Sequence, residues 1–325
     1  MRQVRPQIDD QTLAAYAVAS IPRIGPATFE QIERGNRIHG HGFAELLRLP
    51  ASRIACEYSL KPDIVHLLKT DRLIEDARRA IAAAHAAGAR LVMKGDCGYP
   101  PQLREALGRQ APAFLFVRGE DCGAMTGGAI AIVGTRHPSR AGVRTASELA
   151  GAVARSGRAV ISGYADGIDK AAHLGALAAG GRTILVLAYG NAVFEPMAPV
   201  SRALRDGSAL AVSQFRPFEA FSTGTAMARN RVVAAWCQSL VAVETRTRGG
   251  TMETARMALE RNRPVFAVDW GTTAKTPEGN RRLLAGGARP LRVEIGRRRL
   301  DIDVQALFAP PPLPDPSGQL ALSLG

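Results

Sequence analysis

The sequence predicts an α/β protein built on a parallel β-sheet, and its central stretch gives the reasons. Three short apolar runs rich in Val, Ile and Ala occur there, at Ala129–Val133, Ala159–Ile161 and Thr183–Leu187. Each run is too short for a globular helix and is typical of a buried strand. Helical segments at about Arg140–Ser156 and Gly167–Ala179 separate the runs. This alternation predicts a parallel sheet with right-handed crossovers.

Small residues follow the ends of these strands. Two strands end in the turns Gly134-Thr135-Arg136 and Ser162-Gly163-Tyr164, and the second turn continues to Gly167. A similar order of strand end, small residues and helix start recurs at Met227–Arg231 and at Gly249–Thr251. Since ligands of open parallel sheets bind at the carboxyl ends of strands, we expect these four turns to form the binding surface.

A small helical region is predicted before the sheet, over residues 1–88. The segment Ile21-Pro22-Arg23-Ile24-Gly25-Pro26 resembles the hairpin of a helix-hairpin-helix (SAM-like) module, whose turn can offer N–H groups to a DNA phosphate. Arg23 stands where the hairpin usually has its first glycine, so the alternative is a hairpin kept for packing. A second helical stretch is predicted over Asp63–Ala87, ending at Gly88.

Residues 89–308 are predicted to form the α/β domain. The loop Gln214–Gly224 in this domain carries Phe215, Phe218 and Phe221, which either stack on unpaired bases or cover an edge of the core. Further strands are expected at Arg90–Lys94, Ala113–Val117, Ala209–Ser213, Leu240–Val243 and Pro264–Val268, and further helices start near Ala226, Thr251 and Glu278.

Composition narrows the class of protein. The chain has 325 residues, with 42 Lys and Arg against 29 Asp and Glu, so its formal net charge is +13. Such an excess favours a polyanionic partner, nucleic acid first. Four cysteines without a CxxC pair argue against a zinc site and a disulfide framework. With no secretory signal and no apolar run of about 18 residues, we expect a cytoplasmic protein without metal or cofactor.

Several motifs in a fixed order resemble the DprA/Smf family of bacterial DNA-processing proteins, over about Gly95 to Leu291. They are Tyr99-Pro100 with Leu103, Val133–Arg136, Ser162–Asp169 with Ala172-His173, Arg229-Asn230-Arg231, Gly250-Thr251, and Gly279-Asn280 with Gly287-Ala288. The resemblance implies an extended Rossmann-like sheet with helices on both faces. It also implies non-catalytic binding of single-stranded DNA, loading of RecA recombinase during natural transformation, and a homodimer.

This chain departs from the family pattern at several positions. Asp166 occupies a position that is often basic, and Gly249-Gly250 replaces the usual Ser-Gly. Asp269-Trp270 replaces a Pro-Gly, and too few residues follow Phe308 for the winged helix that many members carry. The departures are typical of a divergent branch.

The turns and the resemblance together predict a DNA-binding surface that holds phosphates. Arg136, just past a strand end, can grip a phosphate bidentately. Arg229 and Arg231 are predicted at a helix start, where they oppose the helix dipole unless an anion is bound. The alternative is an ion pair of these arginines with Asp169 or Glu253. The predicted site residues are Gly134, Thr135, Arg136, Ser162, Gly163, Gly167, Arg229, Asn230, Arg231, Gly249, Gly250 and Thr251.

Enzymatic interpretations are also open. The chain lacks the G-x-G-x-x-G fingerprint and a P-loop. Asp169 and His173 are spaced as an acid–base pair on one helix face, or as a local contact that supports the turn. Gly249–Glu253 resembles the glycine-rich turn of the lysine-decarboxylase-like (LOG) nucleotide hydrolases, with Glu253 as the candidate catalytic residue. The alternatives to a non-enzymatic DNA-binding protein are therefore a nucleotide-binding or N-glycoside-hydrolysing enzyme, or a nucleotide sensor in phage defence.

The C-terminal residues 309–325 are predicted to be a flexible tail. Its first part is rich in proline and should be extended. The last part, with Gln319, Leu320, Leu322 and Leu324, resembles the hexapeptide by which bacterial proteins dock on the β sliding clamp. The alternatives are a tail without a partner or a strand packed on the core.

Overall fold

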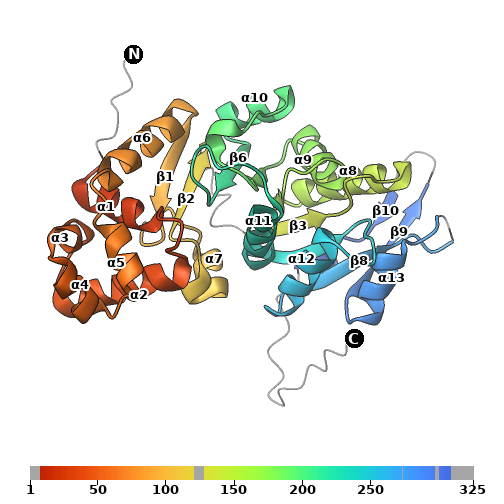
Figure 1. The fold of residues 1–325 in the computed structure, drawn as a ribbon. Helices are drawn as coiled ribbons and strands as arrows, with labels where there is room; N and C mark the ends of the chain where they lie inside the picture. Colours follow the sequence, from red (N-terminus) through yellow and green to blue (C-terminus); the bar gives the residue numbers. More distant parts are fainter. Residues whose placement is uncertain (1–7, 121–127, 273, 297–299, 309–325) are drawn as a thin grey trace.

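A computed structural model describes residues 8–120, 128–272, 274–296 and 300–308. It contains one sheet with the strand order β1-β2-β6-β5-β4-β3-β7-β8-β9-β10 (Figure 1). The predicted α/β class with a large, mostly parallel sheet is therefore confirmed. Gln319, Leu320, Leu322 and Leu324 lie outside the described residues.

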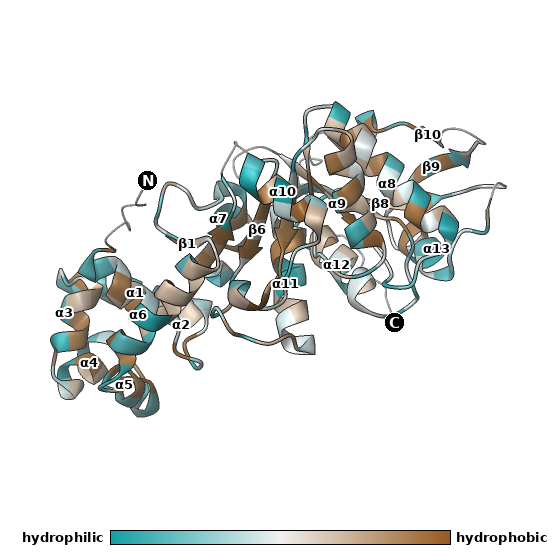
Figure 2. Ribbon diagram, turned by 90° about the horizontal axis from the view of Figure 1, so that it is seen from above, coloured by the Kyte–Doolittle hydropathy of each residue, from teal (hydrophilic) through white to brown (hydrophobic). Residues whose placement is uncertain are grey.

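Seven strands form the parallel part of the sheet. They read as continuous apolar runs because both faces of the sheet are covered, and every residue of β3, β4, β5 and β6 is buried. Figure 2 shows this apolar interior. The strands are β3 (Ala129–Val133), β4 (Ala159–Ser162), β5 (Thr183–Val186), β6 (Ala209–Ser213), β7 (Cys237–Ala242), β8 (Val265–Asp269) and β9 (Arg289–Ile295).

Helices cover the sheet on both faces. On one face, α8 (Arg140–Arg155) and α9 (Ile168–Ala178) pack with β3 and β4, and α10 (Ala198–Asp206) packs with β5 and β6. The opposite face is covered by α7 (Pro101–Leu107), α11 (Thr223–Trp236), α12 (Gly250–Leu259) and α13 (Glu278–Ala285). Among the described helices, none combines the length and the hydropathy that a membrane-spanning helix requires.

Antiparallel strands extend the sheet at both ends. At one end β1 (Ala89–Met93) pairs with β2 (Phe114–Arg118), which pairs with β6. At the other end β10 (Leu300–Ile302) pairs with β9. Neither β9 nor β10 was predicted, because polar residues and a proline interrupt the apolar pattern of these short strands near the sheet edge.

The predicted helical region is present and comprises α1 (Asp10–Ala19), α2 (Pro26–His39), α3 (Phe43–Arg48), α4 (Ala51–Tyr58), α5 (Pro62–Leu68) and α6 (Leu73–Ala86). The single helical stretch predicted over Asp63–Ala87 is wrong, since α5 and α6 are separated by a turn at residues 69–72. Thr70 and Asp71 in this turn favour local hydrogen bonds over a continuous helix.

The N-terminal helices pack against the antiparallel end of the sheet, as Figure 1 shows. Their apolar cluster includes Phe114 and Phe116 of β2. The ring of Tyr16 meets these two phenylalanines edge to face, at centroid distances of 4.9 and 5.5 Å. The helices therefore share their core with β1 and β2, and the domain limits at residues 88 and 308 stay predictions.

Candidate nucleic-acid interface

The sheet has one topological switch point, between β3 and β7. From β3 the chain adds β4, β5 and β6 on one side, and then returns to add β7, β8 and β9 on the other. At such a point the loops leaving the two central strands diverge and open a crevice at the carboxyl ends. The loops after β3 and β7 contain two of the four predicted turns.

A cavity of about 400 Å³ lies at this point. It is bordered by the turns after β3, β4 and β7 and by α11. Nine of the twelve predicted site residues line it, namely Gly134, Thr135, Arg136, Gly163, Arg229, Asn230, Gly249, Gly250 and Thr251. The structure thus brings these nine residues, which are spread over positions 134 to 251 of the sequence, together around one cavity.

Three predicted residues do not line the cavity. Ser162 is fully buried and its hydroxyl donates to the carbonyl oxygen of Ile132 at 2.6 Å. Gly167 has a φ of 86°, and a Cβ there would collide with the backbone of Thr135 and Arg136. Ser162 and Gly167 therefore allow the turns to approach each other. Arg231 is exposed on α11, outside the cavity.

The prediction that Arg229 and Arg231 stand at a helix start is wrong. Helix α11 begins at Thr223, where Ser222 caps it by accepting from the N–H of Thr225 at 3.0 Å. Both arginines therefore lie in the body of the helix, and the dipole argument does not apply to them. The sequence signal was missed because the Ser222–Thr225 capping box was assigned to an exposed loop.

Arg229 is a buried arginine in the floor of the cavity. It is only 5% exposed, and its guanidinium donates to the carbonyl oxygen of Val186 at 3.3 Å. Its Nη1 lies 3.9 Å from Asp169 Oδ2, which confirms the ion pair considered as the alternative. Gly163 is required beside it, because a Cβ at this position would collide with the guanidinium.

Asp169 fixes the turn after β4. Its carboxylate accepts from the N–H groups of Gly163 at 3.2 Å and of Ala165 at 3.4 Å. Burial raises the pKa of Asp169, and the charge of Arg229 opposes this change. Burial also lowers the pKa of Arg229. The pair is therefore a structural support of the cavity floor.

His173 does not pair with Asp169. Its Nδ1 lies 2.7 Å from the hydroxyl of Thr183, and burial lowers its pKa to about 3. A neutral, fully buried imidazole directed to a threonine makes no acid–base pair with the carboxylate. The two side chains are local supports of the turn and of α9.

The rim of the cavity carries exposed cations. Arg136, Arg246 and Arg248 line it and are exposed, and none of them forms an ion pair within the part of the chain that the structure describes. The guanidinium of Arg136 lies over the ring of Phe221, 5.3 Å from its centroid. Since Asp169 is the one acidic residue among the lining residues described, the cavity is strongly positive.

Sequence reasoning missed Arg246, Arg248 and His137 as lining residues. The two arginines lie between the end of β7 and the start of α12, directly before the predicted Gly249–Thr251 turn. The prediction stopped at the small residues of each turn. The rule that ligands bind at the carboxyl ends of strands could have found these cations, if it had been applied to every residue between a strand end and the next helix.

The turn that bears Arg136 is held by Glu244. The carbonyl oxygen of Glu244 accepts from the N–H of Thr135 at 2.8 Å. Its carboxylate accepts from the N–H of Ser139 at 3.0 Å and from the hydroxyl of Ser139 at 2.9 Å. The turn after β3 is thus anchored to Glu244, the second residue after β7.

The candidate catalytic residue of the hydrolase alternative lies elsewhere. Glu253 is on α12 but does not line the cavity, and its carboxylate pairs with Arg256 at 3.0 Å. Asp166, at the position that is often basic in the family, pairs with Lys170 at 2.6 Å and is also outside the cavity. Neither carboxylate lines the cavity, and Asp166 interacts electrostatically with Arg136 from outside it.

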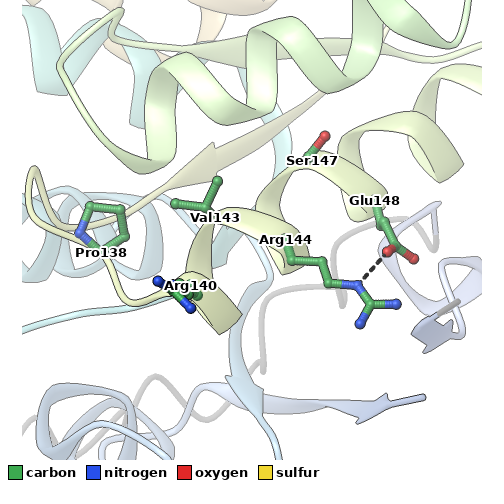
Figure 3. Close-up of a pocket in the computed structure, with 6 residues that line it drawn as sticks. All are labelled: Pro138, Arg140, Val143, Arg144, Ser147 and Glu148. Atoms are coloured by element: carbon green, nitrogen blue, oxygen red, sulfur yellow. Dashed lines mark hydrogen bonds and ion pairs between the residues drawn. The ribbon is translucent and has the colours of Figure 1, made fainter. Parts of the chain in front are cut away.

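A separate hollow of about 500 Å³ lies on the exposed side of α8 (Figure 3). It begins at Pro138, directly after the cavity residue His137, and includes Arg140 and Val143. Arg144 also lines it but is paired with Glu148 at 2.8 Å. Because Glu148 lines it and pairs with one of its two arginines, this hollow is less positive than the cavity.

Comparison with known proteins identifies the family. The family model of DNA recombination-mediator protein A matches residues 90–295. The chain belongs to this family. The matched segment contains every residue that lines the cavity, whereas the helices α1–α6 and the tail lie before and after it.

Curated relatives carry the names DprA and Smf. The chain is 32% identical over 197 residues to DNA processing protein DprA of Streptococcus pneumoniae. This alignment covers 60% of the chain and 67% of the relative. It is 30% identical over 216 residues to DprA of Bacillus subtilis, covering 66% and 71%. Protein Smf of Escherichia coli is 35% identical over 196 residues, covering 58% and 50%.

Solved structures of the family share the fold. The X-ray structure of DprA from Streptococcus pneumoniae superposes with a TM-score of 0.71 at 24% identity, covering 87% of this chain and 95% of that chain. A structure of DNA processing protein A from Helicobacter pylori, described by its single-stranded DNA binding mode, superposes with a TM-score of 0.54 at 23% identity, covering 63% and 92%.

Proposed function

We propose that this chain binds single-stranded DNA in the cavity at the switch point, without reading its sequence, and protects it for a recombinase. The observation that carries the proposal is the group of exposed arginines, Arg136, Arg246 and Arg248, around one crevice. Guanidinium groups and free N–H groups at a helix start bind phosphates of any sequence. In α12 the helix start is provided by Gly250 and Thr251, which line the cavity.

The dimensions and the aromatic rim favour an unpaired strand. A cavity of about 400 Å³ is in the range of small-ligand sites and is too small for a duplex. Phe221 is 50% exposed and lies beside Arg136, so part of its ring is accessible to a base at the rim. Base–aromatic stacking is available only to bases that are not paired in a helix.

The family supports the finer parts of this proposal. A relative from Helicobacter pylori is described as binding single-stranded DNA. From the same resemblance we propose that the DNA is handed to RecA in natural transformation and that the chain acts as a homodimer. The proposed role is binding rather than catalysis, which agrees with the pairing of Glu253 to Arg256.

A salt titration tests the proposal. Fluorescence anisotropy would compare a single-stranded oligonucleotide with its duplex between low and physiological salt. We expect tighter binding of the single strand and a linear loss of log affinity with log salt. Preference for the duplex, or binding that does not respond to salt, would contradict it. Release of free base from a nucleoside monophosphate would instead support the hydrolase alternative.

The tail provides a second proposed partner. We propose that Gln319, Leu320, Leu322 and Leu324 dock on the β sliding clamp, with the glutamine in a polar pocket and the last two leucines in an apolar one. The support is the sequence of the tail alone, at the end of a proline-rich spacer that would hold it away from the sheet.

A further inference from the structure

Large apolar side chains are exposed close to the cavity. Among the described residues, Phe218 is 69% exposed, Phe221 is 50% exposed and Val193 is 45% exposed. Phe218 lies three positions before Phe221 in the same loop. Val193 belongs to the turn after β5, whose Ala192 N–H donates to the carbonyl oxygen of Pro217 at 2.9 Å. These three exposed side chains, which we call the ledge, stand on two loops joined by this hydrogen bond.

The loop that carries the ledge is pinned in place. Gly190 donates its N–H to the carbonyl oxygen of Glu219 at 2.8 Å, and a Cβ at Gly190 would collide with the backbone of Arg216 and Pro217. Arg216 also pairs with Glu219 at 2.8 Å. The phenylalanines are therefore held in exposed positions by an ordered loop. Because exposed apolar side chains are unfavourable in water, such a group indicates a binding surface.

Phe218 opens onto a second hollow that is separate from the cavity. This hollow has a volume of about 480 Å³ and lies between the loop and helix α6, where Asp76, Arg79 and Ala80 line it. Arg79 pairs with Glu75 at 3.0 Å, and Arg216 in the same hollow pairs with Glu219. With its arginines neutralised and Asp76 present, the hollow disfavours a phosphate and suits an uncharged, flat group.

We propose that Phe218 is a second stacking site, for an unpaired base, on a DNA track that leaves the cavity past Phe221 and ends against α6. This inference rests on the proposed function. It divides the track into a cationic part that holds phosphates and an aromatic part that holds bases. It also makes α6, outside the family-matched segment, one wall of the DNA-binding surface.

The aromatic loop is continuous with the cavity, and this favours DNA as the occupant of the ledge. Phe221 lines the cavity and lies against Arg136, so the aromatic loop is part of the proposed phosphate site as well as of the ledge. A strand held by its phosphates at the rim would direct its next bases to this loop. A protein partner on the ledge is the competing occupant, and the experiment below separates the two.

The test compares normal and partly abasic oligonucleotides. Phe218→Ala, Phe218→Tyr and the control Ile38→Ala would be purified, because Ile38 is 66% exposed on α2, which lines neither the cavity nor the hollow. Affinities would be measured for an oligonucleotide long enough to leave the cavity and for the same strand lacking bases beyond the cavity-bound nucleotides. We expect Phe218→Ala to lose roughly tenfold on the normal strand. We expect no loss on the abasic strand, near-native affinity for Phe218→Tyr, and no change for Ile38→Ala.

Each outcome of this experiment supports or overturns the second stacking site. Native affinity of Phe218→Ala for the normal strand would overturn the second site, as would an equal loss on both strands. In that case the ledge would be left to a protein partner, while binding by the wild-type chain would still uphold the proposed function. If the wild-type chain bound neither strand, the proposed function would fail and the second site with it.

Discussion

The arginines around the cavity are of two physical kinds. Arg229 is buried, contacts the carbonyl oxygen of Val186 and pairs with Asp169, so it supports the floor. Arg136, Arg246 and Arg248 are exposed and unpaired within the described residues, so their charge is available to a ligand. Burial thus separates a structural arginine from binding arginines.

Replacing the exposed cations should weaken DNA binding without harming the fold. For Arg246→Ala with Arg248→Ala we expect lower affinity for single strands of every sequence. The slope of log affinity against log salt should fall by about 0.7 for each phosphate that the variant no longer neutralises. Arg231→Ala is the matched control, an exposed arginine outside the cavity. Equal effects of the control and the double variant in anisotropy titrations would contradict the assignment.

His173 should make stability depend on pH. Its pKa is lowered to about 3 in the folded chain, against 6.5 for an ordinary histidine. Between these values the unfolded chain binds a proton that the folded chain excludes. The free energy of unfolding is therefore undiminished above about pH 6.5 and decreases as the pH falls.

Urea unfolding at pH 7 and pH 5 measures this effect. We expect a loss of about 2 kcal/mol at pH 5 from His173 alone. His173→Gln should remove that part of the pH dependence, whatever its effect at pH 7. A variant whose stability still falls by the same amount would show that other groups cause it.

At the scale of elements, the cavity is made of turns anchored to each other. The turn after β3 is bound to Glu244 behind β7, and the turn after β4 is bound to Asp169 at the start of α9. Each turn is therefore held by a residue of another loop or of the next helix. Such anchoring keeps the N–H groups and Arg136 in place before a ligand arrives.

Glu244→Ala tests this anchoring. Removing a negative charge near a cationic cavity should by itself strengthen DNA binding, because it adds to the positive field. We expect the opposite, a several-fold loss of affinity with an unchanged salt slope, since the Arg136 turn loses the two hydrogen bonds to Ser139. Glu244→Gln, which keeps an acceptor oxygen, is the control. Tighter binding by Glu244→Ala would refute a positioning role.

At the scale of the molecule, the sheet places the binding surface and the helical region side by side. The switch point lies between β3 and β7 in the middle of the strand order, and the N-terminal helices pack at the β1–β2 end. The loop with Phe218 and Phe221 connects these parts, because it lines both the cavity and the hollow against α6. A strand can therefore contact both parts of the chain.

Deleting the tail should separate partner binding from DNA binding. A chain lacking residues 319–325 should no longer co-purify with the β sliding clamp, because the peptide that offers Gln319 and the leucines is gone. Its affinity for single-stranded DNA should be unchanged, since the tail follows the domain that holds the cavity. Co-purification that survives the deletion would exclude the tail as the docking peptide.

Local sequence patterns were sufficient to predict the class of fold, the helical N-terminal region and nine of the residues that line the cavity. Val- and Ile-rich runs with intervening helices specify a parallel sheet, and the strand ends of such a sheet meet at one edge. Nine of the predicted residues, Gly134 and Gly250 among them, therefore line one cavity.

Which cations face the ligand depends instead on the packing of the folded chain. Arg229, Arg231 and Arg248 look alike in sequence, but α11 turns Arg229 into the core and leaves Arg231 outside the cavity. Likewise β9 pairs with β8 although polar residues and a proline interrupt its apolar pattern, so its place in the sheet was not predicted. Burial and the direction of a side chain depend on residues that are distant in sequence and close in the folded chain. The order of residues alone does not say which of them become neighbours.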